Sequence, residues 1–155
     1  DDSGTFARGL NATDLTGMLY QAGYSATTWS VGDLSTKTAT NSNGSTYTAW
    51  DVSNVKTMAA MFEHSKFNGD ISGWDVSNVK SMRWMFKYSV FNQDISQWDV
   101  SNVIHMKRMF MHSNFNQDIS NWKINPICDT YDMFNNCPIN ADFIPYQSGK
   151  RIKIK

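Results

Sequence analysis

Hydrophobic residues recur along this chain at a fixed spacing of 24 residues. From position 50, three successive segments read WDVSNVKTMAAMFEHSKFNGDISG, WDVSNVKSMRWMFKYSVFNQDISQ and WDVSNVIHMKRMFMHSNFNQDISN. A unit this short cannot bury its own apolar face, so copies of it must stack on one another. The pattern therefore predicts a repeat solenoid built from 24-residue coils.

Two kinds of apolar spacing occur within each repeat. Trp74 and Val76 are two residues apart, which is typical of a short strand with both side chains on its inward face. A spacing of three and four, typical of one buried helical stripe, follows in Val79, Met82, Met85 and Phe86. The predicted fold class is an α/β repeat solenoid with short parallel strands on one face and short helices on the other. The tryptophan column is its buried spine: Trp50, Trp74, Trp98 and Trp122.

The two ends of the chain depart from the regular repeat. Residues 1–49 are predicted to form an N-terminal cap, with a degenerate coil around Leu15, Met18 and Leu19. The cap also holds a polar stretch at 35–48 that reads as a surface loop or an irregular hairpin. Residues 50–121 are the three regular repeats.

The C-terminal end is predicted to close the stack. Residues 122–146 form a degenerate capping repeat, in which Met133 and Tyr146 keep the 24-residue register with Met109 and Trp122. Residues 147–155 are a basic tail that reads either as a short edge strand or as a linker. Caps are expected because an open end of a solenoid would expose its core.

The net charge and the motifs of the sequence argue against several classes of function. Lys and Arg number 14, as do Asp and Glu, so the neutral chain has no global attraction to nucleic acid or a membrane surface. No apolar run approaches membrane-spanning length. Phosphate-binding loops and nucleophile–histidine motifs are absent from the sequence, which predicts a protein that is not an enzyme.

Cys128 and Cys137 allow two interpretations. A disulfide between them would staple the last coil and indicate an oxidising compartment. The alternative is a pair of small buried thiols, because Cys137 falls in the column held by Ser65, Ser89 and Ser113.

Positions that vary between repeats indicate a binding surface, since the coil itself does not require them. They concentrate on the outer side of the predicted helix, where a tryptophan is predicted to face solvent beside basic residues. Such a composition is typical of binding hot spots and also suits stacking on a sugar ring. The candidate residues are Arg83, Trp84, Lys87, Tyr88, Lys107, Arg108 and His112. The alternatives are a solvated helix face with one partly covered tryptophan, and a self-association surface.

The aspartates form a second candidate surface. Asp75 and Asp99 follow the tryptophans and are predicted to point away from the core. Each can accept the backbone N–H two residues further on, as an Asx turn. The less favoured alternative is a stripe that binds calcium or a cationic ligand, since calcium needs six or more oxygen ligands. No other metal or cofactor is expected, because His64 and His112 are separated by two coils, about 10 Å.

Asparagines recur in step with the turns. Asn68, Asn92 and Asn116 occupy one column and are predicted to form a hydrogen-bonded ladder from coil to coil.

These repeats resemble a short repeat of bacterial surface proteins that reads roughly F-N-x-D-I-S-x-W-D-V-S-x-V-x-x-M-x-x-M-F. Residues 91–110 match it nearly letter for letter, and the resemblance covers residues 51–140. The repeat occurs in bacterial surface lipoproteins and large secreted adhesins, and is akin to BspA-like leucine-rich repeats. The resemblance implies a leucine-rich-repeat-like solenoid on the outside of a bacterial cell.

Attachment is the function that this resemblance implies. The expected partner is a protein, peptide or glycan on a host or neighbouring cell, with no nucleic acid and no membrane insertion. The family repeat carries no catalytic motif that applies to residues of this chain. The rival hypothesis is a structural spacer or stalk that sets length and rigidity without binding.

Overall fold

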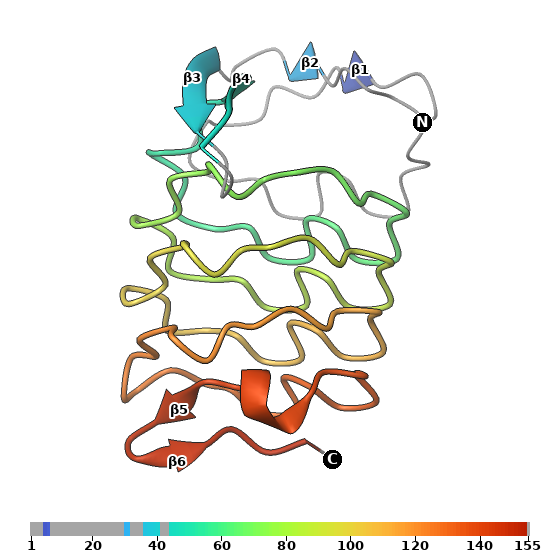
Figure 1. The fold of residues 1–155 in the computed structure, drawn as a ribbon, viewed down its shortest axis with the longest axis vertical. Helices are drawn as coiled ribbons and strands as arrows, with labels where there is room; N and C mark the ends of the chain where they lie inside the picture. The colour runs from blue at the N-terminus through green and yellow to red at the C-terminus, as the bar shows by residue number, and fades with distance from the viewer. Residues whose placement is uncertain (1–4, 7–29, 32–35, 41–43, 155) are drawn as a thin grey trace.

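Successive coils of the chain lie against one another along the long axis of the molecule (Figure 1). The computed structural model describes residues 5–6, 30–31, 36–40 and 44–154. Parallel β-bridges join Thr57 to Ser81, Ser81 to His105, and His105 to Asp129. We refer to residues 50–73, 74–97, 98–121 and 122–146 as the first to fourth coils.

Tight turns and cross-coil hydrogen bonds replace the helix that the sequence predicts in each repeat. The N–H of Phe62 donates to the carbonyl of Met85 at 2.9 Å, whereas the N–H of Met61 donates to Met58 at 3.2 Å within its own coil. Ala60 has a left-handed backbone, with φ at 54°. The helix prediction is therefore wrong. Every second N–H points to the next coil, so it is not available to the carbonyl four residues earlier, and left-handed residues interrupt a right-handed helix.

The inward stripe is nevertheless buried as predicted. The side chains of Val79, Met82, Met85 and Phe86 are all fully covered. Phenylalanine rings stack through the four coils at centroid distances of 5.4, 5.5 and 5.6 Å, in the order Phe62, Phe86, Phe110 and Phe134. The core is thus a set of ladders that run along the stack, and burial of these side chains is the main driving force for stacking.

The tryptophan column is buried too, except at its first member. Trp74, Trp98 and Trp122 are buried, whereas Trp50 is half-buried. No strand forms at Trp74 and Val76; the parallel pairing lies at Ser81 instead. The predicted parallel contact between coils is therefore present, but on a different segment of the repeat.

The asparagine ladder is confirmed. Backbone N–H groups of Asn92 and Asn116 each donate to the side-chain oxygen of the asparagine one coil earlier, both at 2.8 Å. Asn140 continues the ladder by donating to Asn116 at 2.8 Å. Its own side-chain oxygen accepts from the N–H of Asp142 at 2.9 Å and caps the 3₁₀ helix η1 (Ala141–Phe143). The ladder ends at Asn140 because its side-chain oxygen, which would accept an N–H from a further coil, accepts the N–H of Asp142 instead.

Short strands lie at both ends of the stack. Strand β1 (Thr5–Phe6) pairs in parallel with β2 (Ser30–Val31). Strands β3 (Thr36–Thr40) and β4 (Thr46–Trp50) form an antiparallel pair, so the polar stretch adopts the hairpin alternative. The degenerate coil predicted around Leu15, Met18 and Leu19 lies outside the described residues.

The C-terminal tail forms a hairpin rather than a fifth coil. Strand β5 (Tyr146–Gln147) pairs antiparallel with β6 (Lys150–Arg151). The amide of Gln147 donates to the carbonyl of Cys128 at 2.8 Å and joins this hairpin to the fourth coil. The predicted placement of Tyr146 in the tryptophan column is wrong, because its side chain is 52% exposed on β5. No helix among the described residues is long and apolar enough to cross a membrane.

Candidate functional site

In each coil, the side chains that lie between and just after the buried Met and Phe residues point away from the core, and we call the surface that they form the outer face. It comprises positions 59, 60, 63 and 64 of the first coil and their equivalents 24, 48 and 72 residues later. Seven of the predicted site residues lie on it: Arg83, Trp84, Lys87, Tyr88, Lys107, Arg108 and His112. Asp75 and Asp99 lie elsewhere, in the turns that follow Trp74 and Trp98.

A stacked column of rings runs along the outer face. The ring of Tyr88 lies 4.6 Å from that of His64 and 4.7 Å from that of His112, with interplanar angles of 15° and 4°. Asn136 approaches the Nε2 atom of His112 at 3.4 Å. Tyr88 is 43% exposed, yet its two neighbours cover both faces of its ring. The 24-residue register placed these residues in one column, but only the structure shows that the rings touch.

Trp84 is less accessible than the sequence suggested. Its side chain is half-buried, and the guanidinium carbon of Arg83 lies 5.0 Å from the centroid of its ring. The structure thus favours the alternative of a partly covered tryptophan on the outer face, because Arg83 folds over it as a cation–π partner. The Nε atom of Arg83 is itself buried and has no hydrogen-bond acceptor.

Two of the four basic residues of the outer face have ion-pair partners in neighbouring coils. Lys87 contacts Glu63 at 2.8 Å. Nε of Arg108 lies 3.5 Å from Oδ2 of Asp132. The contact between Arg108 and Asp132 is not a hydrogen bond, because Nε of Arg108 has no hydrogen-bond partner among the described residues. It is best described as an electrostatic contact.

The other two basic residues form a column of their own. Arg83 and Lys107 occupy equivalent positions in adjacent coils, and neither has a carboxylate within ion-pair distance among the described residues. The Nζ atom of Lys107 lies 5.2 Å from the centroid of the Tyr131 ring in the fourth coil. Like charges at the spacing of adjacent strands, about 4.8 Å, repel each other.

The backbone beneath the outer face is left-handed at two positions in every coil. In the second coil these are Trp84 and Tyr88, with φ of 58° and 55°, and in the third they are Arg108 and His112, with φ of 55° and 56°. Left-handed backbone costs most residues about 1–2 kcal/mol, whereas Gly, Asn and Asp tolerate it. The two middle coils therefore hold large side chains at strained positions.

The aspartate columns form Asx turns. Oδ1 of Asp75 accepts from the N–H of Ser77 at 3.1 Å and from its hydroxyl at 2.6 Å, and Asp99 does the same with Ser101. The hydroxyl of Ser101, and then its N–H, hold the pKa of Asp99 below its usual value. The Asx-turn alternative is confirmed, and its physical basis is local hydrogen bonding within each repeat.

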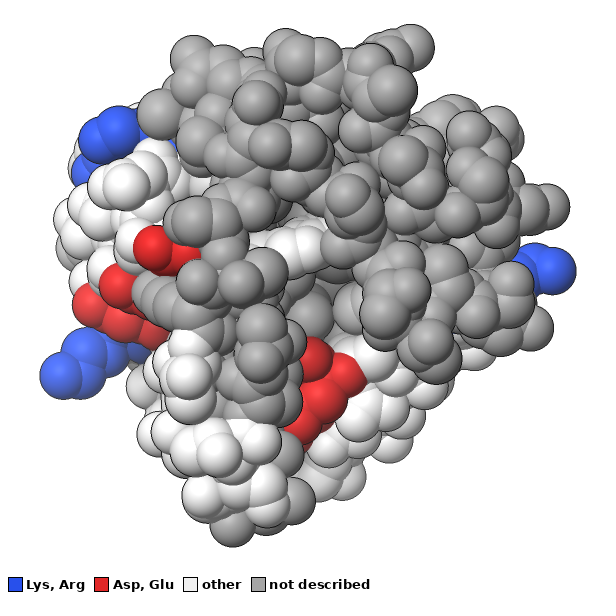
Figure 2. Space-filling view, turned by 90° about the horizontal axis from the view of Figure 1, so that it is seen from above, with Lys and Arg blue, Asp and Glu red and all other residues white. Residues whose placement is uncertain are grey.

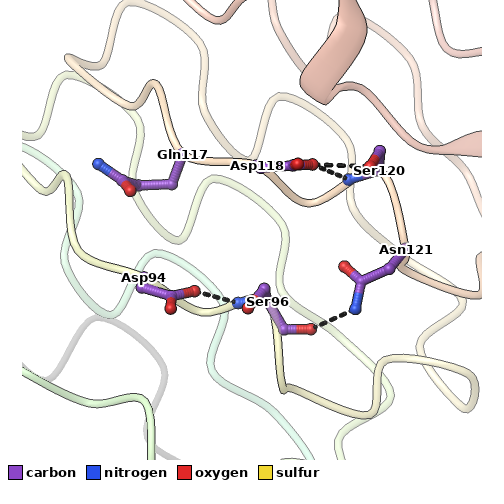
Figure 3. Close-up of a pocket in the computed structure, with 6 residues that line it drawn as sticks. All are labelled: Asp94, Ser96, Gln117, Asp118, Ser120 and Asn121. Atoms are coloured by element: carbon purple, nitrogen blue, oxygen red, sulfur yellow. Dashed lines mark hydrogen bonds between the residues drawn. The ribbon is translucent and has the colours of Figure 1, made fainter. Parts of the chain in front are cut away.

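A polar pocket that the sequence did not reveal lies between the turns of adjacent coils (Figure 3). Its volume is about 340 Å³, and it is lined by Asp94, Ser96, Gln117, Asp118, Ser120 and Asn121. Asp118 accepts the hydroxyl of Ser120 at 2.7 Å, which lowers its pKa, and Asp94 accepts the N–H of Ser96 at 2.9 Å. No cluster of three or more His, Cys, Asp or Glu side chains suited to a metal occurs in the described ranges.

The cysteines are free and buried, so the disulfide alternative is not formed. Sγ of Cys137 lies 3.7 Å from the hydroxyl of Ser113, as expected from their shared column. Burial raises the pKa of Cys137 and raises that of Cys128 to about 11. Both thiols are therefore packing residues with little reactivity.

Comparison with known proteins identifies a family. The chain belongs to the family described as "Mycoplasma protein of unknown function, DUF285", which matches residues 32–145. The match includes the first three coils and all but the last residue of the fourth. No curated protein matches the chain. No solved structure matches it either.

Proposed function

We propose that this domain is a non-catalytic ligand-binding or adhesion module of a bacterial surface protein. It acts outside the cell and recognises a protein, peptide or glycan on another surface through the outer face. The fold class that we propose with it is a leucine-rich-repeat-like solenoid akin to BspA-like repeats. The repeat sequence at residues 91–110 and the stacking of coils in register support this class.

One observation carries the proposal. Trp84, Tyr88, Arg108 and His112 all occupy left-handed positions, where Asn or Asp would fit with less strain. The fourth coil has Asp132 and Asn136 at the same two positions. Strained backbone persists only where the surrounding structure imposes it, and residues held in it cluster at functional sites. The middle coils thus hold residues that the fold alone does not favour.

The chemistry of the outer face suits recognition by side chains. Its alternate backbone N–H groups are used between coils, as for Trp84, which donates to Lys107 at 3.1 Å, and Arg108, which donates to Tyr131 at 2.9 Å. A partner therefore finds few main-chain donors to pair with and meets charged and aromatic groups instead. Arg, Trp and Tyr are the residues that contribute most to binding at protein interfaces.

The test is attachment by a doubly substituted domain. We expect Trp84→Ala with Arg108→Ala to weaken binding to glycan arrays, peptide arrays and host-cell surfaces at least about tenfold, the usual effect of losing a hot-spot residue. Asn114→Ala with Lys123→Ala is the matched control, since both residues are exposed and lie outside the outer face. Circular dichroism checks that each variant is folded. Attachment at the wild-type level by the folded Trp84/Arg108 variant would exclude the outer face.

A second experiment tests the candidate surface formed by Asp75 and Asp99. Asp75→Asn with Asp99→Asn keeps side-chain oxygens in the Asx turns and removes the charges. If these residues contribute to a cationic or calcium-dependent site, binding falls and loses its calcium dependence. Unchanged binding with and without calcium removes Asp75 and Asp99 from the site.

The structural spacer remains the second candidate. Unbroken ladders of phenylalanine and asparagine favour it, because they make the stack stiff without reference to any ligand. A spacer binds none of the surfaces above. Sedimentation of the isolated domain distinguishes both hypotheses from self-association through the outer face.

A further inference from the structure

The outer-face column of position 59 contains Arg83 and Lys107 and leads into a groove at the C-terminal end of the stack. Tyr131 is the fourth member of that column, and Lys107 lies over its ring at 5.2 Å. The same tyrosine lines a groove of about 370 Å³ between the fourth coil and the β5–β6 hairpin. Lys150 and Lys153 line the other side of this groove. The outer face and the groove are thus continuous through Tyr131.

Basic groups dominate this path. Lys150 and Lys153 are exposed, and neither they nor Arg83 and Lys107 have an ion-pair partner in the part of the chain that the structure describes. The acidic residue of the groove lining, Asp132, contacts Arg108 at 3.5 Å. We call Arg83, Lys107, Lys150 and Lys153 the basic track.

Arg151, also in the groove lining, is already engaged. Its Nε donates to the hydroxyl of Tyr146 at 3.0 Å, and it lies 3.4 Å from a carboxylate oxygen of Asp142. Its role is to hold the hairpin, so it is not included in the basic track.

The chain is neutral overall, so the positive charge of the basic track depends on where the acidic residues lie. Seen from the end of the stack where β1 to β4 lie, Asp and Glu side chains gather in two separate groups (Figure 2). Asp75 and Asp99 are bonded within their own turns, as is Asp118. The acidic residues of the outer face, Glu63 and Asp132, contact Lys87 and Arg108, which are not in the basic track. The basic track therefore presents one sign of charge to a ligand.

Neighbouring side chains already contact the aromatic rings near the track. Arg83 lies over Trp84, His64 and His112 cover Tyr88, and Lys107 and Arg108 lie over Tyr131. Single-stranded nucleic acids are bound through bases that stack on free aromatic faces. Charge and hydrogen bonding are therefore the main contacts that we expect along this track, and the single-stranded DNA probe tests stacking.

We propose that the basic track binds a linear anionic polysaccharide whose sulfate or carboxylate groups run along the stack, from Arg83 past Tyr131 into the groove. This inference rests on the proposed function and names its ligand class. The Nε atom of Arg83 is buried and out of a ligand's reach. A bound sulfate or carboxylate pairs instead with the charge of the half-buried Arg83 side chain and offsets the repulsion between Arg83 and Lys107. The ligand must be extended, because two coil steps alone span about 10 Å.

The experiment measures binding of the full 155-residue chain to defined polyanions. The probes are heparin-derived oligosaccharides of increasing length, an unsulfated uronic acid polymer, neutral dextran and single-stranded DNA. The variants are Arg83→Gln with Lys107→Gln, and Lys150→Gln with Lys153→Gln. Lys66→Gln with Lys123→Gln is the control, with the same change of charge at exposed positions outside the track. Lys150 lies on β6 and Lys153 two residues beyond it, and both are exposed, so this pair tests the track even if the first pair affects folding.

We expect the anionic glycans to bind with an affinity that rises with length and falls with added salt, and dextran not to bind. Each track pair should weaken binding about tenfold or more, as expected when two charge-assisted contacts are lost, and the control pair should not. Equal loss in the control, indifference to both track pairs, or tighter binding of single-stranded DNA would each overturn the inference. Attachment to surfaces without binding to any polyanion also overturns it and leaves the proposed function intact. Failure to bind any surface or probe rejects both.

Discussion

The indole N–H of Trp98 donates to the carbonyl oxygen of Ile71 at 3.0 Å, across 27 positions of the sequence. Both residues are buried, at 4% and 3% exposure. Trp122 makes the same bond to Ile95 at 3.1 Å. Each of these carbonyls also accepts a backbone N–H in its own turn, from Trp74 at 3.1 Å for Ile71 and from Trp98 at 3.1 Å for Ile95. The indole is therefore a second donor to a buried carbonyl, so this column contributes hydrogen bonds as well as apolar area.

Trp98→Phe should destabilise the domain by about 0.5–1.5 kcal/mol, because the buried carbonyl of Ile71 loses one of its two donors and keeps the N–H of Trp74. The matched control is Trp84→Phe, a half-buried tryptophan outside the core. Urea unfolding measures both. If the two substitutions cost the same, the bond to Ile71 does not contribute to stability.

Asn92→Ala should cost about 1 kcal/mol, the usual net worth of one hydrogen bond. Its side-chain oxygen accepts the backbone N–H of Asn116, and alanine offers no acceptor there. Asn114→Ala is the control, because that side chain is exposed and no side-chain hydrogen bond of Asn114 is found among the described residues. Thermal unfolding that ranks Asn114→Ala as the more harmful change would contradict the ladder.

Ala60→Gly should leave stability unchanged or raise it by up to about 1 kcal/mol, since glycine relieves the cost of a left-handed backbone. Ala59→Gly, one residue earlier, should lower stability by about 0.5–1 kcal/mol, because Ala59 does not have a positive φ. The two variants differ only in position. Opposite signs in chemical denaturation are the expected result, and equal losses would show that position 60 is not strained in solution.

Alkaline pH should destabilise the domain through Cys128. Burial raises its pKa from 9.0 to about 11, so the folded state favours the protonated thiol. The stabilisation is fully present below pH 9.0 and is lost as pH rises toward 11, at up to about 1.4 kcal/mol per pH unit. Cys128→Val should flatten this part of the stability profile. An unchanged slope between wild type and variant would show that Cys128 does not titrate in this range.

Much of the core could be predicted because the three regular repeats can be compared with one another, and the positions that stay apolar in all of them are the buried ones. Val79, Met82, Met85 and Phe86 recur in equivalent form in every regular repeat, and all four are buried. The ladder of Asn68, Asn92 and Asn116 follows from the same register. Asx turns such as Asp99 with Ser101 depend only on residues two apart, so local sequence suffices to predict them.

The candidate site was predicted less fully than the core. Placing Trp84 and Tyr88 outside the core required only the register. That Arg83 folds over Trp84, and that Lys107 reaches Tyr131, depends on side-chain conformations that no spacing encodes. The groove beside Lys150 was not predictable at all, since it exists only where the β5–β6 hairpin meets the fourth coil.

The sequence by itself determined the 24-residue period, the inward residues of each coil and the local turns, because each of these depends on spacing along the chain. Only the tertiary structure decided how the backbone N–H groups are used. The N–H of Phe62 bonds to Met85 in the next coil, and not to the carbonyl four residues before it as in a helix. A spacing of three and four fits either arrangement. The neighbouring coil decides between them, because it supplies the acceptors, and its presence is a property of the folded stack.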